Sequence, residues 1–368
     1  MGSPRWGRWG AHGGDMSSSC ILPVGRLQEW AAGLVARYRV LAPKERSGVW
    51  VFEDYLAGAP LDLSYPLTQL SPKKCLIAPR QVLYRYDTDG HRLVPEISAV
   101  PTVILGVHTC DQHAIRLMDR ILSQGFPDQH YQAQREQTLL VGIDCAHPCS
   151  PQSFCRSMGT ANPATGAFDL HLTLLGNDYW VDIGSAKGAA LFEGFHGVFP
   201  PSEQDALRRD QVLRDKWQAF PYRLDFDVTE LPGLMAESTE SALWQRLGDR
   251  CLACGACTQV CPTCYCFDVS DEVSLDLTQG ERARSWDSCQ INDFAVVAGG
   301  HNFRQKRAAR QRHRFMRKGK YQYDATDTVG CVGCGRCASA CLVGITPLET
   351  FNELWQLRRA RHGEEEGL

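Results

Sequence analysis

The sequence predicts an α+β protein, in which an N-terminal α/β domain with a small mixed sheet precedes a mainly helical, cysteine-rich domain. Two short apolar runs flank a helical stripe before residue 230, which is the pattern of a βαβ unit with parallel strands. Beyond that point helical spacing dominates, and eleven of the seventeen cysteines lie there. We therefore expect a flexible tail over residues 1–19, an α/β domain over 20–230 and a helical domain over 231–368, divided near the ELPG stretch.

The elements of the first domain follow from periodicity. Residues 26–40 have the apolar spacing of a helix, and residues 49–56 have the composition of a strand. Residues 64–75 are expected to form a loop. The later elements, in chain order, are strand 101–107, helix 110–125, strand 138–143, strands 168–175 and 178–183 around a Gly-Asn turn, and helices 203–219 and 236–250.

Composition and charge exclude some classes of protein. Of 368 residues, 43% are apolar and 22% charged, and the net charge of −3 favours no particular bulk partner. No apolar run approaches the roughly 18 to 20 residues that a membrane span needs. The first nineteen residues carry positive charge without an apolar core, unlike a secretory signal. We expect a cytoplasmic protein, in which clustered cysteines are metal ligands rather than disulfides.

Two cysteine runs share one spacing, with gaps of two, two and three residues. In such a run, three thiolates ligate one [4Fe–4S] cluster and the fourth ligates the neighbouring cluster. Cluster 1 would be held by Cys251, Cys254, Cys257 and Cys341, and cluster 2 by Cys331, Cys334, Cys337 and Cys261. Zinc is the alternative, but it is usually held by well-separated CxxC pairs. The whole repeat therefore favours a dicluster domain.

The 69 residues between the runs (262–330) distinguish this region from a compact bacterial ferredoxin. Many of them have helical patterns, so a helical ferredoxin-like domain with an insertion is expected. Within the insertion, residues 301–320 carry nine Lys or Arg and no acid. These cations could raise cluster potentials or contact a partner subunit, form a solvated helix face, or bind nucleic acid.

A third group of cysteines is predicted at one edge of the first domain's sheet. Cys110 follows strand 101–107, whereas Cys145, Cys149 and Cys155 follow strand 138–143. Neighbouring parallel strands end at the same edge, so these loops should meet there. Four converging thiols could hold a third [4Fe–4S] cluster, or they could be small core residues beside a mobile loop. Nearby Asp111, His113 and His147 would support the site by hydrogen bonds or lie at the surface.

The segments RARSWDSCQINDFAVVAGGHNFR (282–304) and CVGCGRCASAC (331–341) resemble the beta subunit of cytosolic sulfhydrogenases and NAD(P)-linked [NiFe] hydrogenases. They are similar also to a related iron–sulfur subunit of anaerobic sulfite reductase. SPKK (71–74), GVHTCD (106–111) and CAHPCSPQSFC (145–155) extend the resemblance over most of the chain from about residue 25. Here Ser153 precedes Phe154-Cys155 where the family has a TCFC-like pair, so the fourth ligand of the third cluster stays open. Leu342 replaces the usual proline after the last cysteine.

The resemblance implies an electron-transfer subunit that is not catalytic alone. It would connect a flavin- and NAD(P)H-binding reductase partner with [NiFe] hydrogenase small and large subunits, or with a sirohaem sulfite reductase subunit. The sequence agrees, because it lacks a G-x-G-x-x-G fingerprint, a [NiFe] motif and a sirohaem pattern. The other class of function is an iron–sulfur sensor that binds nucleic acid through the basic segment.

Five cysteines stand outside these ligand sets. Cys264, Cys266 and Cys289 could join a rearranged cluster, form a redox-active pair, or pack beside cluster 2 and tune it. Cys20 and Cys75 are isolated and are expected to be core filler.

Overall fold

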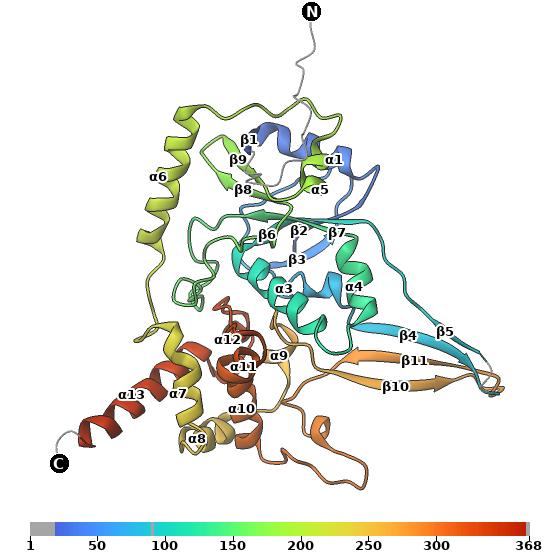
Figure 1. Cartoon of the computed structure of the whole chain (residues 1–368), viewed down its shortest axis with the longest axis vertical. Helices are drawn as coiled ribbons and strands as arrows, with labels where there is room; N and C mark the ends of the chain where they lie inside the picture. Colours follow the sequence, from blue (N-terminus) through green and yellow to red (C-terminus); the bar gives the residue numbers. More distant parts are fainter. Residues whose placement is uncertain (1–18, 90–91, 366–368) are drawn as a thin grey trace, which may run out of the picture.

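The computed structural model describes residues 19–89 and 92–365. A seven-stranded mixed sheet with flanking helices forms the N-terminal part, and a largely helical region follows (Figure 1). The expected α+β class is confirmed. The tail expected over residues 1–19 lies outside the described residues, apart from Ser19 in β1.

The first sheet has the strand order β1-β9-β8-β7-β6-β2-β3. Its four central strands, β8, β7, β6 and β2, are parallel, and the outer strands pair antiparallel. Every residue of β6 and β7 is buried, as expected for parallel strands that helices cover on both faces. The strands are β1 Ser19–Pro23, β2 Arg39–Arg46, β3 Val49–Asp54, β6 Thr102–His108, β7 Thr138–Ile143, β8 Leu170–Leu174 and β9 Asp178–Ile183.

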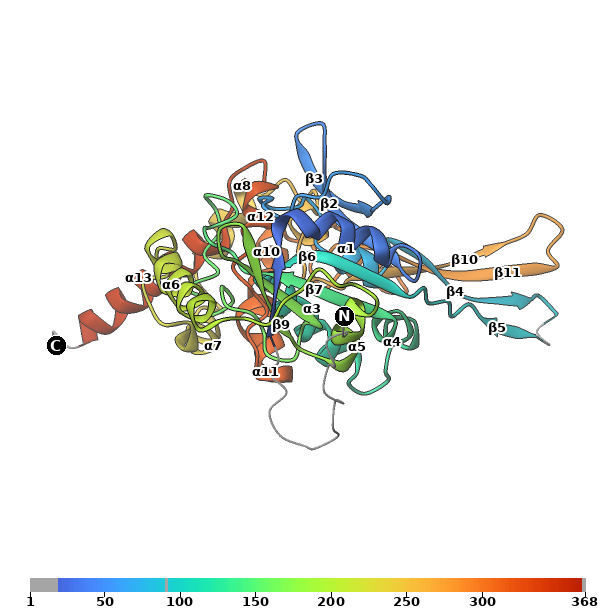
Figure 2. The same ribbon diagram turned by 90° about the horizontal axis from the view of Figure 1, so that it is seen from above.

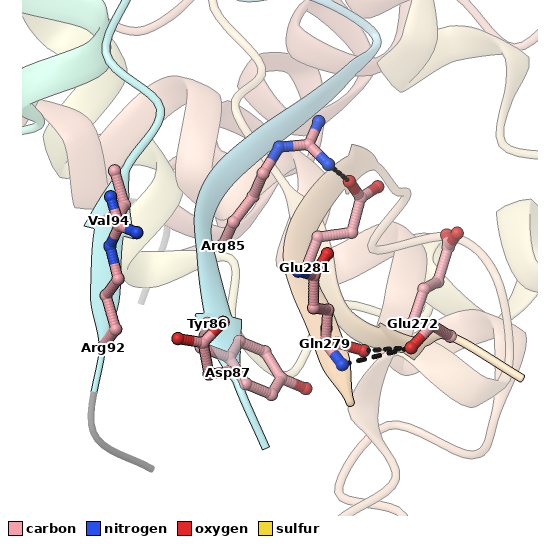
Figure 3. Close-up of a pocket in the computed structure, with 10 residues that line it drawn as sticks. Arg85, Tyr86, Asp87, Arg92, Val94, Glu272, Gln279 and Glu281 are labelled. Carbon is pink, nitrogen blue, oxygen red and sulfur yellow. Dashed lines mark hydrogen bonds and ion pairs between the residues drawn. The ribbon is translucent and has the colours of Figure 1, made fainter. Parts of the chain in front are cut away.

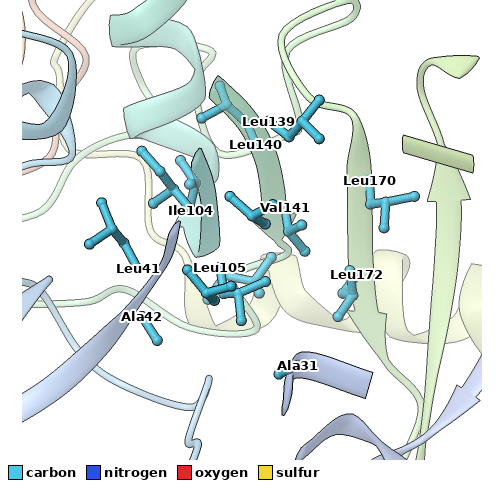
Figure 4. Packing of buried hydrophobic residues seen from close by; sticks show 14 of the residues in the cluster. Ala31, Leu41, Ala42, Ile104, Leu105, Leu139, Leu140, Val141, Leu170 and Leu172 are labelled. Carbon is cyan, nitrogen blue, oxygen red and sulfur yellow. The ribbon is translucent and has the colours of Figure 1, made fainter. Parts of the chain in front are cut away.

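Helices pack on both faces of this sheet, with α1 on one face and α3 and α4 on the other (Figure 1). Ile104, Val141 and Leu172 from adjacent strands form the core together with Ala31 of α1 (Figure 4). The helices are α1 Leu27–Leu34, α2 Lys73–Leu76, α3 Thr109–Leu122, α4 Gln129–Glu136, α5 Ala186–Ala189 and α6 Glu203–Ala219. Short 3-10 turns occupy Val24–Arg26, Ala190–Phe192, Val228–Glu230 and Asp293–Ala295.

A second, antiparallel sheet, with the order β10-β11-β4-β5, projects from the body (Figures 1 and 2). Its strands are β4 Arg80–Asp87, β5 Leu93–Pro95, β10 Phe267–Val273 and β11 Gln279–Trp286. Helical patterns are expected for many residues of the insertion between the cysteine runs, but Phe267–Val273 and Gln279–Trp286 form strands instead. Because β4 pairs with β11, this sheet joins chain segments from both sides of residue 230. The division at residue 230 stays a prediction.

The helical region packs around a second core that includes Leu234, Trp244, Phe315 and Phe351. Helices α8 and α10 approach closely at Gly248. A Cβ at this position would lie 2.5 Å from the backbone nitrogen of Ala308, so the contact requires glycine. The elements are α7 Leu231–Glu237, α8 Leu243–Arg250, α9 Ala256–Gln259, α10 Arg307–Met316, a π-helical turn Arg317–Tyr321, α11 Gln322–Thr326, α12 Arg336–Ser339 and α13 Pro347–Glu365. Over residues 19–89 and 92–365, no helix is both long enough and apolar enough to span a bilayer.

Three local predictions differ from the structure. The helix expected over residues 26–40 ends at Leu34, and β2 begins at Arg39 because that segment joins the sheet beside β6. The helix expected over 236–250 is two helices, with a break between Glu237 and Leu243. The loop expected over 64–75 contains the start of α2.

Candidate iron–sulfur site

Both cysteine runs adopt the same backbone conformation. Ala253 and Gly255 in the first run have φ angles of 55° and 78°, and the corresponding Gly333 and Gly335 have 66° and 80°. A helix of one turn follows in each case, α9 in the first run and α12 in the second. These left-handed residues fold each run tightly, so that its first three cysteines face a common cavity.

The first cavity is lined by Cys251, Cys254, Cys257 and Cys341, the residues expected to hold cluster 1. Polar hydrogens point at two of its sulfur atoms. The Gln311 amide donates to the Sγ of Cys251 at 2.8 Å, and the Ile345 backbone N–H donates to the Sγ of Cys341 at 3.2 Å. Such donors stabilise negative charge on sulfur, so the cavity suits thiolate ligands.

The second cavity is lined by the residues expected to hold cluster 2, which are Cys261, Cys331, Cys334 and Cys337. Cys264 also lines this cavity, and its thiol contacts that of Cys261. Cys257 lines both cavities, so the two groups of thiols adjoin. Burial raises the pKa of Cys257 and of Cys337 to about 11. These two thiols are therefore protonated near neutral pH without a metal, and metal binding would displace their protons.

Part of the basic segment turns inward toward these cavities. Arg314 of α10 is only 5% exposed and lines both of them, while Lys318 lines the second. Burial alone would lower the pKa of Arg314, but the adjacent Cys257 and Cys337 raise it above its usual range. Arg310 is also buried, and Arg307 donates to the carbonyl oxygen of Cys251 at 2.8 Å. The segment is therefore not a uniformly solvated face.

The third group of cysteines lies at the carboxyl ends of β6 and β7. Cys110, Cys145 and Cys155 are buried in one cluster with Cys334, and Cys149 packs against it. The structure thus brings the four predicted thiols together. It adds His108, which the sequence analysis missed: the ligand atoms of His108, Cys145 and Cys149 lie within 4.8 Å of one another.

His108 ends β6 and precedes the first turn of α3. Its place in the sequence, two residues before Cys110, is the feature that could have identified it as part of this site. Its Nδ1 lies 3.2 Å from the Sγ of Cys149. Burial lowers the pKa of His108 to about 4, so its ring is neutral near pH 7. A neutral imidazole can hydrogen-bond a thiol or bind a metal. His108 is therefore a further candidate for the open ligand position.

The loop carrying Cys155 packs directly on the second cysteine run. The Phe154 backbone N–H donates to the carbonyl oxygen of Gly333 at 2.8 Å, and the Thr160 hydroxyl donates to that of Val332 at 2.6 Å. A Cβ at Gly333 would lie 2.7 Å from the backbone nitrogen of Cys155. This close approach requires glycine, and it sets the third group of thiols against the second cavity.

A buried ion pair also holds the second cysteine run against the first domain. The Arg336 guanidinium donates to both carboxylate oxygens of Asp111, at 2.6 and 2.7 Å, and each side chain is 1% exposed. Arg336 also donates to the carbonyl oxygen of Thr68 at 2.8 Å. Asp111 therefore supports the site structurally. His113 contacts the carbonyl oxygen of Asn162 at 3.0 Å, whereas His147 is exposed.

The remaining cysteines divide into a pair and two isolated residues. Cys266 and Cys289 lie within hydrogen-bonding contact of each other, and neither lines the two thiol cavities. Cys20 is buried in β1 and Cys75 is partly buried in α2. Burial raises their pKa values to about 12 and about 11, respectively, as expected for unreactive thiols.

An open hollow on the second sheet is a different kind of feature. Arg85, Glu281 and Glu272 line it among other polar side chains, and Arg85 pairs with Glu281 at 2.8 Å (Figure 3). Among the described residues that line it there is no cysteine or histidine. The hollow therefore contributes no sulfur ligand.

Comparison with known proteins agrees with this chemistry. The profile of the 4Fe-4S dicluster domain family matches residues 250–345, which contain both cysteine runs. Sulfhydrogenase 2 subunit beta of Pyrococcus furiosus is 32% identical over 317 residues, covering 86% of this chain and 92% of that protein. The chain belongs to the sulfhydrogenase beta subunit family. The resemblance inferred from the sequence motifs is thereby confirmed.

As a sulfhydrogenase beta subunit homologue with a dicluster domain, the chain is an iron–sulfur electron-transfer subunit. The identity to the Pyrococcus protein extends far beyond residues 250–345, so the β-sheet part of the chain also belongs to this family architecture. No solved structure gives a significant match to the chain.

Proposed function

We propose that this chain connects, in the cytoplasm, a flavin- and NAD(P)H-binding reductase partner with a catalytic [NiFe] hydrogenase subunit, and that it relays electrons between them. It would carry three [4Fe–4S] clusters, each of which supplies one-electron redox chemistry when bound. The proposed ligands are Cys251, Cys254, Cys257 and Cys341 for cluster 1, Cys331, Cys334, Cys337 and Cys261 for cluster 2, and Cys110, Cys145, Cys149 and Cys155 for cluster 3.

The observation that carries the proposal is the continuity of the three thiol groups. Cys257 lines both the first and the second cavity. Cys334 lines the second cavity and is buried together with Cys110 and Cys155 of the third group. Adjoining groups of ligands keep redox centres close together, as an electron relay requires.

The chain's own residues would set the electrostatics of this relay. Arg314 and Lys318 place positive charge beside the second cavity, which favours the more negative, reduced state of a cluster and raises its potential. Phe154 and Phe315 line the same cavity and exclude water from it. This apolar lining lowers the local dielectric constant, which strengthens the effect of the two cations on the cluster potential.

The proposed partners follow from the family and from what the sequence lacks. The name of the Pyrococcus relative is that of a sulfhydrogenase, which favours a hydrogenase partner over the sirohaem subunit of a sulfite reductase. The sequence carries neither a dinucleotide fingerprint nor a [NiFe] motif, so both reactions would belong to partners. The inward position of Arg310 and Arg314 argues against the alternative of a basic arm for nucleic acid.

Anaerobic purification of the tagged full chain from its native host tests the proposal. We expect a stable complex with a flavoprotein and a [NiFe] subunit, in which NAD(P)H or hydrogen bleaches the absorption of this chain's clusters. Retention on DNA that falls steeply with salt, without protein partners, would instead support the nucleic-acid alternative. Copurification with a sirohaem protein would show that the partner is a sulfite reductase subunit and not the proposed [NiFe] subunit.

A further inference from the structure

Two thiols outside the three ligand groups form a pair at the base of the β10–β11 hairpin. Cys266 immediately precedes β10, and Cys289 follows the end of β11. Cys289 is 4% exposed, whereas Cys266 is partly exposed. Because neither residue lines the two thiol cavities, the pair is not positioned as a set of additional ligands.

The hairpin register explains why these residues meet. Phe267 pairs with Trp286 at the base of the ribbon, and the Asp287 backbone N–H donates to the carbonyl oxygen of Cys266 at 3.0 Å. The chain then turns so that the sulfur atoms of Cys266 and Cys289 lie in hydrogen-bonding contact. Adjoining thiols meet the first requirement for a disulfide, which joins Cβ atoms about 3.5–4.5 Å apart.

The loop that holds Cys289 is fixed on both sides. A 2.7 Å hydrogen bond joins the hydroxyl groups of Ser288 and Thr258, which is in the first cysteine run. The Gln290 amide donates to the carbonyl oxygen of Arg310 in α10 at 2.9 Å. The pair is thus attached to the elements that surround the first cavity.

A buried chain of hydrogen bonds connects the pair with the first cavity. The Gln290 Nε2 donates to the Sγ of Cys289 at 3.4 Å, and the Gln290 Oε1 accepts from the Gln311 Nε2 at 3.0 Å. The same Gln311 nitrogen donates to the Sγ of Cys251 at 2.8 Å. All four residues are less than 9% exposed, so water does not interrupt this connection.

We propose that Cys266 and Cys289 form a reversible disulfide that exchanges electrons with the relay through Gln290 and Gln311. Reduction breaks the Sγ–Sγ bond, consumes two electrons and two protons, and leaves two thiols. A cluster held by Cys251, Cys254, Cys257 and Cys341 would supply the electrons one at a time, so the inference rests on the proposed function, and the protons come from solvent at Cys266. Oxidation would reverse the change, returning two electrons singly to that cluster and two protons to solvent.

The surroundings of the pair favour this chemistry over simple packing. Arg317 and Lys318 lie near Cys266, and cations stabilise the thiolate that attacks or leaves in thiol–disulfide exchange. Cys20 and Cys75 have no such neighbouring thiol among the described residues and serve as internal controls. A two-electron station would let the one-electron relay store a pair of electrons.

Differential alkylation with mass spectrometry tests the proposal on the anaerobic, iron-loaded chain. Samples are equilibrated in dithiothreitol buffers of graded potential, quenched in acid, and alkylated after unfolding. We expect a linked peptide pair containing Cys266 and Cys289 in oxidised samples, with a tenfold change in the disulfide-to-dithiol ratio for about 30 mV. Cys20 and Cys75 should be alkylated equally in every sample.

Single variants distinguish a redox-active pair from cluster ligands. In Cys266→Ser or Cys289→Ser, the remaining thiol should be alkylated at every potential while iron content stays unchanged. Loss of roughly four irons in both variants would overturn the inference, because the residues would then be cluster ligands. Free thiols at every potential in iron-loaded wild type would also overturn it.

A second arm separates this inference from the relay itself. In the intact complex, NAD(P)H or hydrogen should convert the disulfide to two thiols, and Gln311→Leu should slow that conversion at least tenfold. A disulfide that persists while the complex passes electrons would overturn the coupling. If the complex passes no electrons but the pair still titrates in thiol buffers, the relay fails and the disulfide stands.

Discussion

Replacing Asp111 with alanine tests whether a buried ion pair holds the third group of thiols against the dicluster region. Arg336 donates to both oxygens of Asp111 at 2.6 and 2.7 Å, and both side chains are 1% exposed. Asp111→Ala leaves the guanidinium buried without its counter-charge. Removing one partner of such a pair costs about 3–5 kcal/mol in the free energy of unfolding.

The expected change in melting temperature follows from chain length. Unfolding entropy of about 2.1 cal/mol/K per residue over the whole chain converts this cost into a fall of roughly 4–6 °C. The chain offers a matched control, because Arg39 contacts both oxygens of Asp54 at 2.5 and 3.0 Å. That pair is 51% and 56% exposed, so Asp54→Ala should cost only about 0.2–1 kcal/mol.

Anaerobic thermal unfolding of the iron-loaded wild type and both variants, followed by tryptophan fluorescence, measures the difference. Equal melting temperatures for Asp111→Ala and Asp54→Ala would refute the reasoning from burial. The double variant Asp111→Leu with Arg336→Met separates the charge effect from packing. It should recover most of the lost stability, because no unpaired charge then remains buried.

Four further substitutions, one of them with a control variant, test the site. Cys254→Ser should remove roughly four irons and stop electron transfer in the assembled complex; persistent transfer would show that the route avoids cluster 1. Cys110→Ser should lower the iron content from roughly twelve to roughly eight while the dicluster signals in electron paramagnetic resonance survive; unchanged iron would rule out the third cluster. Arg314→Gln should lower dicluster potentials by on the order of 100 mV, which is the scale of the Coulomb energy between two unit charges about 6 Å apart at an effective dielectric constant of about 20. Unchanged potentials in a redox titration would contradict its electrostatic role. Gly333→Ala should reduce stability and cluster-3 iron, because a Cβ at this position would clash with the backbone of Cys155. Ala253→Gly, at the equivalent position of the first run, should retain all iron. Equal iron contents in the two variants would refute the close packing at Gly333.

The sequence predicted features whose signal is local. Continuous apolar runs identified β6 and β7, because both faces of those strands are covered. Helix α6 spans Glu203–Ala219 as expected, and Ser202 and Asp205 form a capping box at its start. The regular spacing of the cysteines likewise made the dicluster domain visible without any structure.

Features that depend on distant pairing were missed. Every residue of β10 is exposed, so this strand has no alternating apolar pattern, and its ribbon is completed by β4 from a segment almost two hundred residues earlier. Composition also could not show that Arg314 turns inward between two cavities. The approach of His108 to Cys149, and of Cys266 to Cys289, arises only when loops from separate elements meet.

Iron and sulfide analysis of the anaerobically purified full chain, combined with its visible spectrum, tests most directly whether these cysteines hold electron-carrying clusters. We predict brown protein with roughly twelve irons and equal sulfide per chain, and broad absorption near 400 nm that bleaches on reduction. Colourless protein that contains zinc and no sulfide would contradict the assignment.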